Sequence, residues 1–133
     1  MNTNIKILIE AARKVAGHSQ AKYSNFQVGA ALLSTDNQVF TGCNVESSSY
    51  GLTICAERVA LTKALSEGTT DFDKIVIYAG KEDYCPPCGA CRQLLFDYAP
   101  DLSIILTNGQ DYQTHKLKDL LPLAFEDSKL KKK

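Results

Sequence analysis

The sequence has no excess of charge of either sign, because 15 Lys and Arg residues balance 15 Asp and Glu residues. A protein that grips a polynucleotide backbone needs surplus cations to displace counterions. The balance therefore disfavours nucleic-acid binding and favours a small substrate with little charge. The one basic run, at residues 129–133, is interpreted as a solvated tail.

The sequence also lacks any apolar run approaching the ~20 residues that cross a bilayer. Residues 1–12 contain no uninterrupted apolar core followed by a small-residue cleavage site, so secretion is not expected. There is no internal repeat, low-complexity stretch or linker, and 133 residues suffice for a domain with its own core. We therefore expect a single domain over residues 1–133, no membrane partner and a cytoplasmic location.

Hydrophobic periodicity predicts both helices and strands, which alternate in the second half of the chain. Helices are expected at residues 5–15, 55–67, 88–98 and 116–121, with Gly17 and Gly68 closing the first two. Strands are expected at residues 26–34 and 38–45, joined as a hairpin, and at 74–79, 102–106 and 111–115. This order predicts an α/β fold of three layers, in which helices cover both faces of one mixed, roughly five-stranded sheet.

Cysteine is present in an odd number, five, which favours metal binding or thiol chemistry over a disulfide framework. Cys88 and Cys91 lie on the first turn of one predicted helix, and Cys55 begins another. If both helix N-termini point at one spot, three thiolates converge on a zinc ion, and the backbone amides there favour deprotonated sulfur. Three protein ligands leave the fourth position open for water, as in catalytic zinc sites.

The two other thiols are not expected to bind the metal. Cys85 is separated from Cys88 by only two prolines, which makes it a poor additional ligand. Cys43 lies within a predicted strand, where the simpler interpretation is a small buried side chain.

Two charged residues follow Cys55 closely. Glu57 is the only carboxylate adjacent to the thiols and is the candidate proton carrier, although a first-turn glutamate can also simply complement the helix dipole. Zinc with three thiolates carries a net charge of −1, which opposes ionisation of a bound water unless a cation lies nearby. We expect Arg58 to bond a sulfur for this reason. The alternative, that arginines only solvate the helix surface, applies more strongly to Arg92.

With these residues placed, the chain resembles the small, homotetrameric cytidine deaminases over residues 22–125. The resemblance is carried by four ordered blocks, which are YSNFQVGAAL at 23–32, GCNVE at 42–46, YGLTICAER at 50–58 and PCGACRQ at 87–93. It implies hydrolysis of cytidine and 2′-deoxycytidine to uridine and 2′-deoxyuridine plus ammonia. One zinc ion per subunit would be bound by Cys55, Cys88 and Cys91, and zinc-bound hydroxide would attack C4 while Glu57 transfers protons.

The resemblance also implies substrate contacts that the residue types alone would not reveal. Asn44 and Glu46 would hold the ribose 3′-hydroxyl, Phe26 would pack on the base, and the backbone amide of Ala56 would bind the pyrimidine carbonyl. Without the resemblance, Asn44 and Glu46 would be interpreted as polar loop residues. For Phe26, the alternative is a core residue at the start of a strand.

Two further aromatic residues are implied to act between subunits. Tyr50 and Phe125 would reach a neighbouring subunit's site, so that a homotetramer would have composite active sites. The chain departs from the family pattern at residues 47–48, where two serines replace the usual asparagine and alanine, and at the extra thiol of Cys85.

Other classes of protein are compatible with parts of the sequence. CPPC at residues 85–88 matches a thioredoxin-like redox site, but leaves Cys55, Glu57 and Cys91 unexplained. A non-enzymatic zinc ribbon would need a fourth ligand and a basic face. Among deaminases, the charge balance disfavours polynucleotide editors, and Asn44 with Glu46 favours a ribose over blasticidin. A cysteine at position 55, where monophosphate deaminases commonly have histidine, favours the nucleosides.

Overall fold

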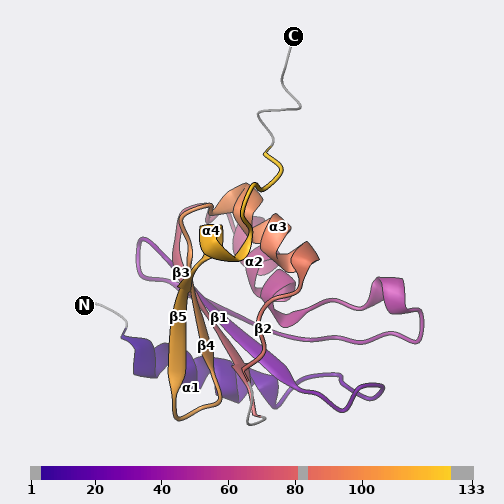
Figure 1. Ribbon diagram of the computed structural model, residues 1–133. Helices are drawn as coiled ribbons and strands as arrows, with labels where there is room; N and C mark the ends of the chain where they lie inside the picture. Colours follow the sequence, from indigo (N-terminus) through magenta and orange to yellow (C-terminus); the bar gives the residue numbers. More distant parts are fainter. Residues whose placement is uncertain (1–3, 81–83, 127–133) are drawn as a thin grey trace.

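The computed structural model describes residues 4–80 and 84–126, so the predicted basic tail at 129–133 lies outside the described residues (Figure 1). One sheet has the strand order β2-β1-β3-β4-β5. Its strands are β1 Val28–Ser34, β2 Val39–Cys43, β3 Phe72–Ala79, β4 Ser103–Thr107 and β5 Tyr112–Lys116. The pair β3 and β4 is parallel and the other neighbouring pairs are antiparallel, which confirms the predicted mixed sheet.

Helices cover both faces of this sheet, as Figure 1 shows, and the predicted three-layer fold is confirmed. Helix α1 packs on one face, and α2, α3 and the short α4 pack on the other. The helices are α1 Ile5–Ala16, α2 Ala56–Ser66, α3 Gly89–Tyr98 and α4 Leu117–Leu120, with a 3-10 turn, η1, at Tyr50–Leu52. Within the described ranges, no helix has the length and apolar character that a bilayer crossing requires.

The central strands are apolar on both sides because side chains alternate between the two layers. Strand β1 is buried along its whole length. The side chains that pack with α1 are Ala31, Leu33, Val76 and Ile105, and those that pack with the other helices are Ala30, Leu32, Ile75, Ile77, Ile104 and Leu106. The sheet thus holds two apolar cores, one on each face.

Two glycines allow helix backbones to lie directly against strands. A Cβ atom at Gly29 would lie 1.9 Å from the carbonyl oxygen of Ala12 in α1. A Cβ atom at Gly42 would lie 2.5 Å from the amide nitrogen of Ala60 and 2.6 Å from the carbonyl oxygen of Ala56. The absence of a side chain at Gly42 therefore allows the first turn of α2 to lie directly on β2.

The helix ends were predicted more closely than the strand ends. Gly68 has φ +90° just beyond α2, and the Gly68 and Thr69 amides donate to the Leu65 and Ala64 carbonyls, which closes the helix as predicted. Strand β1 begins at Val28 and β2 ends at Cys43, each two residues inside the prediction. The reason is that the Asn44 side chain bonds the backbone of residues 26 and 28, where ladder hydrogen bonds were expected.

Candidate metal centre and active site

Three cysteine sulfurs converge where α2 and α3 begin. Cys55 is the N-cap of α2, Cys88 is the N-cap of α3, and Cys91 lies on the first turn of α3. Their Sγ atoms all lie within 4.8 Å of one another. Zn–S bonds of about 2.3 Å place tetrahedral ligands about 3.8 Å apart, so the cluster fits a zinc ion. Within the described part of the chain, no fourth Cys, His, Asp or Glu joins the group, which leaves one position open.

The thiols share protons in a way that metal binding would change. The hydrogen bond from Cys91, aided by Arg58, lowers the pKa of Cys55 to about 5. The same bond to Cys55 and burial raise the pKa of Cys91. Cys55 is thus a thiolate that accepts a hydrogen bond from the protonated Cys91, and zinc binding would release the Cys91 proton.

Arg58 lies against this cluster rather than in solvent. Its Nη2 atom is 3.9 Å from the Sγ of Cys55 and donates to the carbonyl oxygen of Thr53 at 3.0 Å. The hydrogen bond to Cys55 raises the pKa of Arg58. Its Nε is buried and has no hydrogen-bond partner among the described residues. Arg92 instead donates to the carbonyl oxygens of Pro87 and Leu120, both at 2.7 Å, and so fixes the segment that precedes Cys88.

Glu57 is the buried carboxyl group beside the sulfurs. It is the second residue of α2, and its side chain is only 5% exposed. Burial, together with the negative charge of Cys55, raises the pKa of Glu57 to about 7. A carboxyl group with this pKa exchanges protons readily near neutral pH.

A cavity of about 300 Å³ joins the metal cluster to two loops. It brings together seven of the sequence-predicted site residues, which are Phe26, Asn44, Glu46, Cys55, Ala56, Glu57 and Cys88. Ser24, Val28, Thr53, Cys85 and Pro86 complete its wall. The sequence prediction gave no role to Ser24 or Thr53, and only the position of Ser24 in the turn next to Phe26 could have drawn attention to it.

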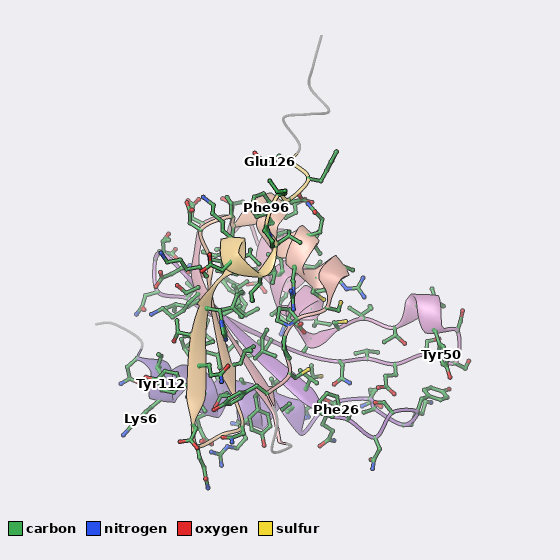
Figure 2. The ribbon with its side chains drawn as sticks, in the orientation of Figure 1. Lys6, Phe26, Tyr50, Phe96, Tyr112 and Glu126 are labelled. Atoms are coloured by element: carbon green, nitrogen blue, oxygen red, sulfur yellow. The ribbon has the colours of Figure 1, made fainter. Side chains whose placement is uncertain are left out.

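Tyr50 and Phe125 do not line this cavity within one chain. Tyr50 is 81% exposed on η1, at the tip of an arm that projects from the sheet (Figure 2). It lines a separate hollow together with Tyr23, Ser24, Glu46, Ser47 and Thr53. Phe125 is half exposed, and its carbonyl oxygen accepts a hydrogen bond from Gln93. That Tyr50 and Phe125 contribute to the site of another subunit stays a prediction.

Asn44 and Glu46 each fasten a part of the segment before β1. The Asn44 amide donates to the Phe26 carbonyl oxygen at 2.9 Å and accepts from the Val28 amide at 3.0 Å. Glu46 accepts from the Tyr23 and Ser24 amides at 3.0 Å each. The two side chains therefore hold the segment that carries Phe26 into the cavity.

A three-layer α/β/α fold with three converging cysteine sulfurs, an open coordination position and a buried carboxyl group defines a class of hydrolytic zinc proteins. Residues 2–107 match the family model described as the cytidine and deoxycytidylate deaminase zinc-binding region. The chain belongs to this family. It therefore carries a zinc site, and Cys55, Cys88 and Cys91 are positioned to hold the ion.

Individual relatives agree with this assignment. The protein named cytidine deaminase from Halalkalibacterium halodurans is 47% identical over 122 residues, which cover 90% of this chain and 92% of that protein. The probable cytidine deaminase of Dictyostelium discoideum is 42% identical over an alignment of 137 residues, which covers 91% of this chain and 90% of that protein. The crystal structure of cytidine deaminase from Burkholderia pseudomallei superposes with a TM-score of 0.88 at 46% identity, covering 92% of this chain and all of that one.

Proposed function

We propose that this chain hydrolyses the free nucleosides cytidine and 2′-deoxycytidine to uridine and 2′-deoxyuridine, with release of ammonia. The observation that carries the proposal is the shared cavity, in which Cys55, Cys88 and Glu57 face Phe26 and the Asn44–Glu46 pair. The names of the relatives support the same reaction.

The chemistry requires a proton carrier close to the ring. When bound, zinc supplies Lewis-acid activation of the hydrolytic water near neutral pH. Glu57 accepts a proton from that water and delivers it to N3 of the cytosine ring as the water oxygen bonds to C4. Glu57 then takes the proton of the new C4 hydroxyl and gives it to the amine, the C4–N bond breaks, ammonia leaves, and a carbonyl forms at C4.

Two groups orient the base in this proposal. The aromatic ring of Phe26, which is half buried at the cavity wall, packs against the pyrimidine. Ala56 is the first residue of α2, where backbone amides have no partner within the helix, and its N–H donates to the pyrimidine carbonyl.

The Asn44–Glu46 pair has capacity left for one sugar hydroxyl. The Asn44 amide has two N–H groups and donates to one carbonyl among the described residues, so its second donor can bind the 3′-hydroxyl oxygen. A carboxylate accepts about four hydrogen bonds, so Glu46 can also accept the hydroxyl proton. Ribose and deoxyribose both carry this hydroxyl, so both nucleosides fit.

The charge of the cavity argues for nucleosides over their phosphate esters. Among the described residues that line it, none is a lysine or arginine, whereas Glu46 contributes a carboxylate. A 5′-phosphate placed there would be repelled by this carboxylate and would find no cation among the described lining residues.

We further propose that the chain forms a homotetramer, in which each subunit is one domain and neighbouring subunits contribute to each active site. The proposed location is the cytoplasm. Large apolar side chains that stand in solvent support the assembly, with Leu52 69% and Leu123 fully exposed besides Tyr50 and Phe125. The free thiols on which the zinc site depends support a reducing compartment. Sedimentation at working concentration tests the assembly, and a fully active monomer would exclude roles for Tyr50 and Phe125.

The substrate assignment is tested by the absorbance loss that accompanies deamination of cytidine, deoxycytidine, cytidine monophosphate and blasticidin S by the zinc-loaded protein. We expect turnover of both nucleosides and little of the other two compounds. Hydrolysis of the monophosphate or of blasticidin S without the nucleosides would overturn the assignment.

A further inference from the structure

The Glu46 carboxylate is held by the turn at Tyr23 and Ser24. One carboxylate oxygen accepts both backbone amides of this turn, each at 3.0 Å, and the other accepts the Ser24 hydroxyl in a short hydrogen bond. The Ser24 hydroxyl is the main reason why the pKa of Glu46 is lowered. Since both oxygens are bonded, the carboxylate cannot rotate about its terminal bond without losing at least one charge-assisted hydrogen bond.

The Ser24 hydroxyl is also bonded on its other side. Its oxygen accepts the Phe26 amide at 3.0 Å, within a turn in which Asn25 has the left-handed φ of +57°. Ser24, Phe26 and Glu46 all line the cavity that is also lined by Cys55, Glu57 and Cys88. One hydroxyl thus connects the carboxylate proposed to bind the sugar with the aromatic residue proposed to pack on the base.

The hydrogen bonds of the turn occupy most of the acceptor capacity of the Glu46 carboxylate. Of about four acceptor positions on the carboxylate, three are used by the turn, which leaves about one for a ligand. The backbone amides bond one oxygen, and among the described residues the Ser24 hydroxyl is the partner of the other oxygen. Without this hydroxyl the carboxylate could turn about its amide-bonded oxygen, and ordering the second oxygen on ligand binding would reduce affinity.

We propose that Ser24 is a positioning residue that holds the Glu46 carboxylate in the orientation in which it binds the sugar hydroxyl of the nucleoside. The inference rests on the proposed function, because it assigns a sugar hydroxyl to Glu46. Ser24 acts through Glu46 and takes no part in the chemical step.

The test compares kcat/KM for cytidine with that for 3′-deoxycytidine, which lacks the hydroxyl. In Ser24→Ala the ratio of the two values falls about five- to tenfold. The ratio cancels any effect on the base through Phe26, which both substrates share. Ser24→Thr retains a hydroxyl and keeps the ratio within about twofold of the wild-type value. Zinc content and thermal unfolding, measured in parallel, stay at wild-type values because the metal cluster and core are untouched.

A double-mutant cycle separates positioning from a general structural effect. In a Glu46→Ala background, Ser24→Ala leaves the ratio unchanged, because there is no carboxylate left to orient. An unchanged ratio in Ser24→Ala, or the same fall with and without Glu46, would overturn the role of Ser24 while leaving deaminase activity intact. Absence of cytidine turnover by the wild-type chain would instead overturn the proposed function, and the role of Ser24 with it.

Discussion

The two sides of the cavity are built in different ways. The metal side consists of helix starts, where Ala56 and Cys91 are fully buried and Glu57 nearly so. The opposite side, which is proposed to bind the sugar and is called the sugar side below, consists of two loops. There the half-buried Phe26 and exposed Ser24 are held by hydrogen bonds between side chains and backbone. Secondary structure thus positions the groups proposed for the chemical step, whereas a local hydrogen-bond network positions those proposed to bind the ligand. Substitutions on the metal side should reduce kcat, and those on the sugar side should raise KM.

The strongest test of this contrast is Glu57→Gln. The amide has nearly the same shape as the carboxyl group but cannot carry protons, so we expect kcat to fall about 10²- to 10⁴-fold with KM little changed. Zinc content should be retained, because Glu57 is not part of the three-sulfur group. Steady-state kinetics and metal analysis measure both quantities.

Glu67→Gln, at the exposed end of the same helix, is the matched control and should keep wild-type kcat. A fall in kcat of less than tenfold in Glu57→Gln would contradict the assignment of Glu57 as the proton carrier.

The next effect concerns the cation beside the sulfurs. Arg58→Ala removes the group that contacts Cys55, and we expect zinc affinity to fall about 10- to 100-fold. Competition with a chelator of known affinity measures the change. Lys63→Ala removes the same charge from an exposed position of α2 and should leave zinc affinity unchanged. Equal affinities in the two variants would mean that Arg58 does not stabilise the thiolates.

The same contrast explains what the sequence could predict. The metal side could be predicted from local sequence because Cys55, Cys88 and Cys91 lie at helix starts. Helix ends are marked by local sequence signals such as Gly68. Both helices and the sulfur cluster followed from spacing within short stretches of chain. The convergence of the two helix starts itself required the fold, which the alternation of helices and strands predicted.

The sugar side could not be derived in this way. Asn44 and Glu46 bond backbone groups 16 to 23 residues earlier in the chain, and periodicity within a short window contains no information about such pairs. Their place beside the cavity was predicted only from family resemblance. The same bonds shortened β1 and β2 relative to the prediction, and the contribution of Ser24 was missed for the same reason.

Gly42 connects the two sides, because β2 supports the first turn of α2 and continues directly into Asn44. In Gly42→Ala the new Cβ would overlap backbone atoms of Ala56 and Ala60, so we expect a loss of about 1–3 kcal/mol in the free energy of unfolding. Urea unfolding measures it. Gly51→Ala is the matched control, since a Cβ there meets nothing within 4 Å, and its effect should stay within about 0.5 kcal/mol. Equal free energies of unfolding in Gly42→Ala and Gly51→Ala would mean that α2 can move away from β2 at little energetic cost.

The smallest effect is expected at Cys85, which lines the cavity but lies outside the three-sulfur group. Burial raises the pKa of Cys85, so this thiol is a poor metal ligand and a poor nucleophile. Cys85→Ser should therefore retain one zinc per chain and wild-type kcat within about twofold, whereas the same substitution at Cys88 should remove the metal. Metal analysis of the two variants distinguishes the interpretations of the CPPC sequence. A redox site would require both thiols equally, and loss of zinc from Cys85→Ser would make Cys85 a fourth ligand, which would close the position that hydrolysis needs.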